Sequence, residues 1–398
     1  MHVLSSLCLA SLSALALANP VGRRSGPAPL IRARNADLVA DKYIVVITKD
    51  VSTAAVDETL RSYSSNAEHI YNSTIRGFAG ALDDAAIEAL RNNPGVAYIE
   101  QDARFKLADY TVQRNATWGI ARLSHRYNSN DRSSDYTYDD SAGEGTCSYV
   151  IDTGITVDHE DFGGRAEWLR NFSGDGDDRD GAGHGTFVAG ILGSRTYGVA
   201  KRTRLFALKV FDNEGVTTGS AILDAMDFVA RDHPSRGCPR GVTVNMSLGG
   251  GRSEASNDAT DALVDSGAFV AVAAGNSGED AINTSPASAP KACTVGATDS
   301  EDRMASFSNY GSVVDIFAPG VAITSTAYGD SNNEITTASG TSASAPHIAG
   351  LAAYLMALEG NPGGEALCER IKELATPDIL DNIPLGTANL LAFNGSPY

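Results

Sequence analysis

The sequence predicts an α/β fold, a doubly wound, mostly parallel sheet with helices on both faces, preceded by a small α+β domain. From about residue 118 onward, continuous apolar runs that end in glycine-rich turns alternate with helical segments. Strands that are apolar throughout are typical of a parallel sheet covered on both faces. The forty glycines among 398 residues supply the tight turns and close backbone approaches that such a fold needs.

The expected elements of the large domain follow in chain order. Apolar runs predict strands at Ser148–Ile151, Leu205–Val210, Val242–Met246, Ala268–Ala273 and Ala292–Val295. Helical periodicity predicts helices at Gly185–Leu192, Ser220–Arg231, Ser256–Ser266 and Pro346–Leu358. In sheets of this kind the chemistry lies at the carboxyl ends of the strands.

The preceding unit of about 65 residues has a β-α-β-β-α-β-like pattern. β-Branched and apolar content predicts its strands at Lys42–Thr48, Phe78–Leu82 and Val96–Glu100. Helices are expected at Thr53–Ser64 and at Asp84–Asn92, the second capped by Asp83 or Asp84 and stopped by Pro94.

The first 18 residues have the composition of a secretory signal peptide. Leu4–Leu17 consists mostly of Leu, Ala and Ser, and Ala16-Leu17-Ala18 fits a small-x-small cleavage site. The alternative is a short buried helix. No other stretch is long and apolar enough to span a bilayer. We therefore expect a secreted, extracellular protein, with residues 19–41 as a flexible leader.

The formal net charge of −18 is carried entirely by residues 108–398, which hold 20 basic and 38 acidic side chains. An acidic surface argues against nucleic acid and anionic membranes as partners. The acidic segment Asp175–Asp180 has Arg179 at the fifth position of a calcium loop, so it is not an EF-hand and we expect a solvated loop. Sequons occur at Asn72, Asn115, Asn171, Asn245, Asn283 and Asn394.

Ser342 lies in a glycine-containing turn, Ser339-Gly340-Thr341-Ser342, directly before an apolar helical stretch. A helix N-terminus has free backbone N–H groups and a partial positive charge, which stabilise negative charge beside the serine oxygen. Ser342 is therefore a candidate nucleophile, although a serine at this position is also a common helix cap.

Two further segments supply the partners that a serine nucleophile needs. Asp152 ends an apolar strand within Tyr149–Gly154, and His184 begins a helix within Gly183–Gly190. A hydroxyl becomes a good nucleophile when a neutral imidazole accepts its proton, and a buried carboxylate orients that imidazole. Each residue alone has an ordinary structural explanation, but Asp, His and Ser in this order, each beside glycine, indicate an acyl-transfer site.

Asn276 follows the apolar strand Phe269–Ala273 and is the candidate oxyanion donor. Its amide could reach a developing oxyanion together with the backbone N–H of Ser342. Without the other three residues, a strand-end turn would explain this asparagine equally well.

These motifs resemble those of the subtilisin-like serine proteases. The segments are VIDTGI, GHGTFVAG, MSLGGG, VAVAAGNSG, FSNYGSVVDIFAPG and SGTSASAPHIAGLAAYL, and they are most similar to the proteinase K branch. The resemblance covers about Trp118–Asn394, and residues 42–108 resemble the family's ferredoxin-like inhibitory propeptide. The implied organisation is a signal peptide at 1–18, a leader at 19–41, the propeptide at 42–108 and a catalytic domain at 109–398.

The resemblance implies a secreted serine endopeptidase made as a zymogen, acting through an acyl-enzyme. Ser247, Leu248 and Gly249 would pair with one side of an extended substrate, and residues around Gly215 with the other. Ala273, Ala274 and Gly275 would form one wall of a roomy apolar pocket, favouring aromatic and aliphatic residues before the scissile bond. The implied partners are peptide substrates and the chain's own propeptide, and we expect a monomer.

The resemblance also implies how the cysteines pair and where a metal ion binds. Cys147, Cys238, Cys293 and Cys368 remain after the signal peptide, and spacing alone allows three pairings. The family pattern implies the pairs Cys147–Cys238 and Cys293–Cys368. It further implies a structural Ca²⁺ ion held by the carbonyls of Pro290 and Ala292 and the carboxylate of Asp315, and no cofactor for catalysis.

The chain departs from the family pattern at a few positions. Phe187 stands where a second histidine is usual, and Ala343-Ser344-Ala345 replaces Met-Ala-Thr after the nucleophile. These changes leave a catalytically inactive subtilase, acting as a binding protein, as the alternative. An esterase is a further alternative because the same three residues hydrolyse esters, whereas a tripeptidyl exopeptidase would need an insertion that closes the groove.

Overall fold

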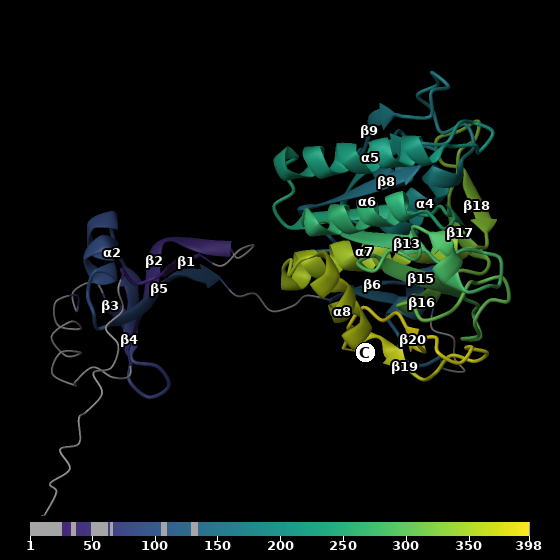
Figure 1. Cartoon of the computed structure of the whole chain (residues 1–398). Coiled ribbons are helices and arrows are strands. Elements are labelled where there is room, and N and C mark those ends of the chain that lie inside the picture. The colour runs from purple at the N-terminus through teal and green to yellow at the C-terminus, as the bar shows by residue number, and fades with distance from the viewer. Residues whose placement is uncertain are drawn as a thin grey trace, which may run out of the picture. The chain divides into compact units, whose positions relative to one another are not determined.

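The structure is a computed structural model that describes residues 26–32, 37–48, 63, 67–104, 110–128 and 134–397. The chain forms two compact units, Met1–Lys106 and Leu107–Tyr398, which are described separately (Figure 1). Among the described residues, no helix combines the length and the apolar character that a membrane crossing requires.

The first unit is a five-stranded sheet packed against one described helix. Its strand order is β1-β5-β2-β4-β3, with all neighbours antiparallel except the parallel pair β1/β5. The elements are β1 (Leu30–Ile31), β2 (Asp37–Ile47), β3 (Ala67–Tyr71), β4 (Gly77–Ala81), α2 (Asp84–Arg91) and β5 (Val96–Arg104). Asp83 caps α2, because its carboxylate accepts a hydrogen bond from Ala86 N at 2.8 Å. The expected helix Thr53–Ser64 lies outside the described residues apart from Tyr63.

The expectation of a flexible leader at 19–41 is wrong for its described C-terminal residues, which include two strands. Leu30 and Ile31 pair with β5, β2 already begins at Asp37, and the side chain of Ala28 is fully buried. The prolines on either side of Ala28 suggested a loop. Yet Pro29 accepts a hydrogen bond from Ile99 N at 2.9 Å, which needs no N–H from the proline itself.

The second unit contains a nine-stranded sheet in the order β19-β20-β16-β15-β13-β11-β8-β10-β9, parallel except for the edge pair β19/β20. Its strands are β8 (Thr146–Asp152), β9 (Ala166–Asn171), β10 (Arg204–Lys209), β11 (Gly241–Met246), β13 (Phe269–Ala273), β15 (Cys293–Thr298), β16 (Ile316–Pro319), β19 (Thr376–Pro377) and β20 (Leu390–Leu391). The predicted doubly wound parallel sheet is therefore confirmed, and the strands that sequence patterns missed lie toward its edges.

Helices cover both faces of this sheet (Figure 1). Neighbouring strand residues point to opposite faces: Val150 packs in the core under α4 and α7, whereas Tyr149 and Ile151 pack in the core under α5 and α6. The helices are α3 (Trp118–Leu123), α4 (His184–Gly193), α5 (Gly219–Asp232), α6 (Glu254–Asp265), α7 (Thr341–Glu359) and α8 (Gly364–Leu374). Short antiparallel pairs join β6 (Tyr110–Gln113) with β7 (Tyr136–Asp139), β12 (Gly250–Gly251) with β14 (Thr284–Ser285), and β17 (Ile323–Thr326) with β18 (Ile335–Ala338).

Helix α7 begins five residues before the predicted start at Pro346. Proline is tolerated near a helix start, but it has no N–H to give to the carbonyl four residues earlier. The carbonyl of Ser342 is consequently left without an intrahelical partner, and this matters for the site described below.

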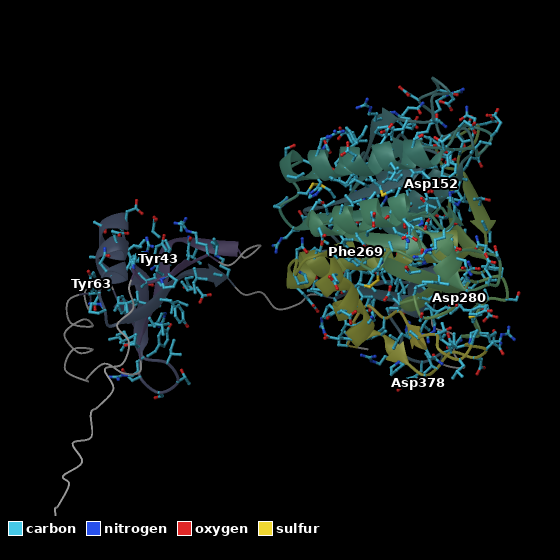
Figure 2. All side chains as sticks on the ribbon, in the orientation of Figure 1. Tyr43, Tyr63, Asp152, Phe269, Asp280 and Asp378 are labelled. Atoms are coloured by element: carbon cyan, nitrogen blue, oxygen red, sulfur yellow. A yellow bond between two sulfur atoms is a disulfide. The ribbon has the colours of Figure 1, made fainter. Side chains whose placement is uncertain are left out.

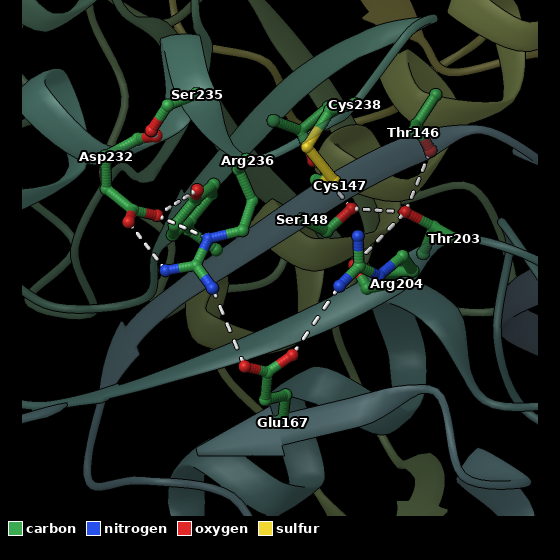
Figure 3. Close-up of a disulfide and its surroundings, with 12 residues drawn as sticks. Thr146, Cys147, Ser148, Glu167, Thr203, Arg204, Asp232, Ser235, Arg236 and Cys238 are labelled. Carbon is green, nitrogen blue, oxygen red and sulfur yellow. Dashed lines mark hydrogen bonds and ion pairs between the residues drawn. A yellow bond between two sulfur atoms is a disulfide. The ribbon is translucent and has the colours of Figure 1, made fainter. Parts of the chain in front are cut away.

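The disulfide bonds are Cys147–Cys238 and Cys293–Cys368, with Cα–Cα distances of 5.6 and 5.7 Å. The first joins the amino-terminal end of β8 to the segment before β11, at the opposite end of β8 from Asp152. Figure 3 shows an ion-pair chain beside it, in which Glu167 lies between Arg204 and Arg236 and Asp232 accepts from Arg236 at 2.6 Å. Both arginines also lie over the ring of the buried Phe206.

Candidate active site

The predicted reactive side chains lie at the carboxyl ends of the parallel strands. Asp152, labelled in Figure 2, is the last residue of β8, and Asn276 follows β13. His184 is the first residue of α4, and Ser342 is in the first turn of α7. A cleft of about 640 Å³ is lined by His184, Asn276 and Ser342 together, so segments that are far apart in the sequence form one site.

Asp152 and His184 form a hydrogen-bonded pair at this cleft, in which the imidazole lines the cleft and the carboxylate lies beneath it. The carboxylate of Asp152 is fully buried, and its Oδ1 lies 2.7 Å from His184 Nδ1. Asp152 Oδ1 also accepts a hydrogen bond from Thr153 N at 2.7 Å. Attraction to Asp152 is the main reason that the pKa of His184 is raised above its ordinary value. An Nδ1–H that donates to this carboxylate leaves Nε2 as the free acceptor of the imidazole.

Ser342 and Ser247 are joined by two reciprocal hydrogen bonds. The Ser342 hydroxyl donates to the Ser247 carbonyl at 3.3 Å, and the Ser247 hydroxyl donates to the Ser342 carbonyl at 2.8 Å. The second bond satisfies the carbonyl that Pro346 leaves without an intrahelical donor. Asn245 Nδ2 in turn donates to the Ser247 hydroxyl at 2.9 Å. The Ser342 hydroxyl therefore donates to the Ser247 carbonyl in this structure. Its side chain must rotate about the Cα–Cβ bond before the hydroxyl can donate to the imidazole of His184.

Asn276 is oriented by Thr341, a residue that sequence reasoning missed. Asn276 Oδ1 accepts hydrogen bonds from Thr341 N at 2.8 Å and from Thr341 Oγ1 at 2.9 Å. Thr341 Oγ1 itself accepts from Gly275 N at 3.1 Å. Because Oδ1 is used in this way, the donating Nδ2 of Asn276 is free to serve the cleft. The sequence feature that could have identified this role is the position of Thr341 directly before the candidate nucleophile Ser342.

Asp180 is a second buried carboxylate beside His184, and it corrects the expectation that Asp175–Asp180 is a solvated loop throughout. Its side chain is 1% exposed and accepts four hydrogen bonds, from Thr153 Oγ1, Gly183 N, Thr186 N and Thr186 Oγ1. The N-cap position of α4 is Gly183, which has no side chain to cap the helix. Asp180 therefore caps α4 in place of an N-cap side chain, because it accepts from the backbone N–H groups of Gly183 and Thr186. It thereby fixes the first turn of α4, which carries His184.

Two other acids of this loop, Asp175 and Asp177, have basic partners within the protein. Asp175 Oδ2 lies 3.2 Å from the ammonium of Lys209, whose side chain is fully buried. Asp177 forms two hydrogen bonds with Arg179, at 2.8 and 2.7 Å. These contacts explain the low pKa of the Asp177 carboxyl, for which Arg179 is the largest cause. Arg179 and Lys209 therefore offset two of the four acidic side chains of this segment.

Most of the predicted substrate-contacting residues line the same cleft. They are Gly215, Ser247, Leu248, Gly249, Ala273 and Gly275. Ala274 does not line it, because its side chain is fully buried and packs with Ala281 and Phe317. The sequons at Asn245 and Asn394 are likewise buried, whereas Asn283 is exposed at the edge of the cleft.

The predicted calcium ligands lie away from the cleft, and the carboxylate of Asp315 already contacts two protein groups. Asp315 Oδ2 accepts a hydrogen bond from Thr294 N at 2.9 Å, and Oδ1 lies 3.4 Å from the ammonium of Lys372. Calcium takes six to eight oxygen ligands, and the only potential ligand side chains gathered with Asp315 among the described residues are Cys293 and Cys368, so the other oxygen ligands would have to be water and backbone carbonyls such as those of Pro290 and Ala292. The cysteine sulfurs form a disulfide and cannot act as thiolate ligands. Lys372 already supplies the positive charge that this carboxylate needs.

A parallel sheet whose strand ends bring an aspartate, a histidine and a serine to one cleft defines a serine hydrolase of α/β architecture. Comparisons with known proteins agree. A profile of the Subtilase family matches residues 143–383, and a profile of Peptidase inhibitor I9 matches residues 42–108. The chain therefore belongs to the subtilase family of serine proteases, and a domain of the I9 inhibitor type precedes its protease domain.

Individual relatives support the same assignment. The chain is 49% identical over 396 residues to the "Cuticle-degrading protease" of Metarhizium anisopliae, with 100% of both chains covered. It is 50% identical over 374 residues to "Proteinase R" of Parengyodontium album, covering 94% of each chain. Among solved structures it resembles "a cold adapted subtilisin-like serine proteinase", with a TM-score of 0.65 and 39% identity, covering 70% of this chain and 98% of that one. The chain is thus a zymogen-type protease similar to the fungal proteinase K-type enzymes.

Proposed function

We propose that this protease is a secreted endopeptidase that cleaves peptide bonds through an acyl-enzyme on Ser342. The observation that supports this most is the 2.7 Å contact between Asp152 and His184 beside a cleft that Ser342 also lines. Asp152 orients the imidazole, His184 is the general base and acid, and Asn276 donates to the oxyanion.

In the proposed reaction the Ser342 hydroxyl oxygen attacks the scissile carbonyl carbon while His184 Nε2 takes its proton. The carbonyl oxygen becomes negative and is stabilised by Asn276 Nδ2 and the backbone N–H of Ser342. The C–N bond then breaks, and His184 returns the proton to the leaving amine. Water attacks the ester in the same manner and releases the acid product.

The groove residues suit an extended peptide and an apolar side chain before the scissile bond. Leu248 and Ala273 give apolar surface to the cleft, and the glycines at 249 and 250 lack side chains that would block an added strand. This supports broad cleavage after aromatic and aliphatic residues. The formal net charge of −18 argues against nucleic acid and anionic membranes as partners, and we propose a monomer.

We further propose that the I9-type domain inhibits the protease until the chain cuts itself near residues 107–111. Leu107, Ala108 and Tyr110 would suit an apolar pocket there. The segment 105–109 lies outside the described residues, so this proposal depends on the sequence and on the match of residues 42–108. Amino-terminal sequencing of the mature secreted product tests the cut and the loss of residues 1–18 together.

The reaction is tested by labelling with a fluorophosphonate, which forms a covalent bond only with an activated serine. We expect one labelled residue, Ser342, and no labelling in Ser342→Ala. Thr341→Ser provides a matched control, since it changes the neighbouring residue but keeps its hydroxyl. Labelling of another serine, or equal peptidase activity in Ser342→Ala, would contradict the proposal.

A further inference from the structure

We infer that the primary pocket also accepts the side chains of lysine and arginine, through the carboxylate of Glu279. This rests on the proposed function, because it concerns the residue that precedes the scissile bond of the same substrates. It extends the expected preference for aromatic and aliphatic residues to a second, cationic class.

The charges of the cleft are the first observation. Of the described residues that line it, only His184 and Glu279 have ionisable side chains, and no lysine or arginine is among them. Glu279 is exposed to solvent, and the structure gives its carboxylate no hydrogen bond or ion pair with any described residue. An unpaired carboxylate in a concave site attracts cationic groups, because the low-dielectric walls focus its field.

The second observation is that the backbone of Glu279 is fixed relative to the pocket wall. Asn309, itself 1% exposed, accepts hydrogen bonds through Oδ1 from Glu279 N at 3.1 Å and from Ser277 N at 3.0 Å. Its Nδ2 donates to the carbonyl of Ala274 at 3.0 Å. One buried amide therefore ties the segment of Glu279 to the strand-end segment that forms the pocket wall.

The same amide reaches another element of the cleft. Asn309 Nδ2 lies 3.3 Å from Thr284 Oγ1, and Tyr310 N donates to the Glu279 carbonyl at 3.0 Å. Gly278, with φ of +65°, allows the sharp turn that brings Ser277 N and Glu279 N to one acceptor. The backbone that carries the Glu279 carboxylate is therefore held in place by tertiary hydrogen bonds.

The third observation is the combination of apolar walls with this single negative charge. A lysine or arginine side chain has a long aliphatic stem that packs on apolar surface while its charged end stays in a polar environment. Leu248 and Ala273 would contact the stem, as they would contact a leucine or phenylalanine. Glu279 would then form the charge-assisted bond that an apolar residue cannot use.

The experiment compares peptides that differ only before the scissile bond, with Lys, Arg, Phe, Leu or Glu at that position. We expect the wild type to cleave the Lys, Arg, Phe and Leu peptides and to cleave the Glu peptide poorly. In Glu279→Gln the ratio of kcat/KM for Lys over Phe should fall about fivefold, mostly through KM, which is the scale of a partly exposed ion pair. In Glu279→Lys the ratio should fall further, and the Glu peptide should improve.

Glu144→Gln is the matched control, since Glu144 is an exposed acid paired with Arg202 outside the cleft and its substitution changes the net charge equally. Its Lys-to-Phe ratio should equal that of the wild type. Raising the salt concentration should lower the ratio in the wild type but not in Glu279→Gln.

Rejection of the Lys peptide by an enzyme that cleaves the Phe peptide would overturn this inference and leave the proposed function standing. An unchanged ratio in Glu279→Gln would also overturn it. An enzyme that cleaves no peptide and takes up no fluorophosphonate would overturn the proposed function, and this inference with it.

Discussion

Ser247 and Ser342 are joined by two hydrogen bonds, since each side chain donates to the backbone carbonyl of the other. Ser247 follows strand β11 and lines the substrate cleft, whereas Ser342 is in the first turn of α7. The substrate-contacting strand end and the candidate nucleophile are therefore positioned by the same pair of contacts. Pro346 makes this possible, since it leaves the Ser342 carbonyl available.

Replacing Ser247 with alanine should lower kcat about tenfold and the free energy of unfolding by about 2 kcal/mol, since the hydroxyl makes two hydrogen bonds and each contributes about 1 kcal/mol. Ser247→Thr keeps the hydroxyl and should recover most of kcat. The measurement is pre-steady-state acylation together with a denaturant melt. Equal rates in the two variants would show that the hydroxyl contact does not position Ser342.

The acidic side of the activity profile should report His184. Catalysis needs the neutral imidazole, so activity falls as the pH drops through the pKa of His184. Attraction to Asp152 raises that pKa above 6.5, and the midpoint of the loss of kcat/KM should therefore lie above pH 6.5. In Asp152→Asn the midpoint should move to lower pH while the plateau falls steeply. A midpoint that stays in place would mean that another group controls the profile.

The orientation of Asn276 by Thr341 leads to a graded prediction. Asn276→Ala should lower kcat by about 10²–10³-fold, the range known for an oxyanion donor in a related subtilisin. Thr341→Val removes only the hydroxyl bond to Asn276 Oδ1 and should lower kcat by about fivefold with KM nearly unchanged. Rates are measured on one peptide. A change in KM alone would place the effect in substrate binding instead.

Much of this arrangement could be predicted from the sequence, because the main signals are local. Continuous apolar runs identified the central strands, and glycines beside Asp152 and His184 marked the strand and helix ends. Asp180 was missed because its role depends on Thr153 and Thr186, which only the folded chain brings to it. Helix α8 was missed as well. Its buried face is short, with Leu367, Cys368 and Ile371 as its apolar members.

The contact between Lys372 and Asp315 predicts that stability depends little on calcium. The melting temperature should change by less than about 2 °C when a chelator is added. Lys372→Gln should lower it by about 2–4 °C, and added calcium should then restore part of the loss. Arg202→Gln serves as the control, since it removes an exposed cation that is paired with Glu144 rather than with Asp315. A large fall of the wild-type melting temperature with a chelator would show that a metal binds despite the lysine.

The alanine after Ser342 predicts tolerance to oxidation. Relatives with methionine at that position have an oxidisable sulfur beside the nucleophile. Here Ala343 takes its place, and Met226, Met246 and Met356 are buried. We expect activity to survive mild peroxide, and Ala343→Met to introduce a rapid loss. Residual activity after timed exposure is the measurement, and rapid inactivation of the wild type without unfolding would contradict the prediction.

The disulfide and the ion pairs shown in Figure 3 affect how well the enzyme resists digestion by other copies of itself. A protease in solution meets other copies of itself, and a peptide bond is cut only after a local stretch of chain opens and enters another molecule's groove. Two kinds of contact link the strands at the end remote from Asp152. The disulfide Cys147–Cys238 joins β8 to the chain before β11, and Glu167 on β9 forms ion pairs with Arg204 on β10 and with Arg236. We therefore expect the disulfide and these ion pairs to oppose the opening of the sheet edge and to slow self-digestion, while they leave the catalytic residues at the other end of the strands unconstrained.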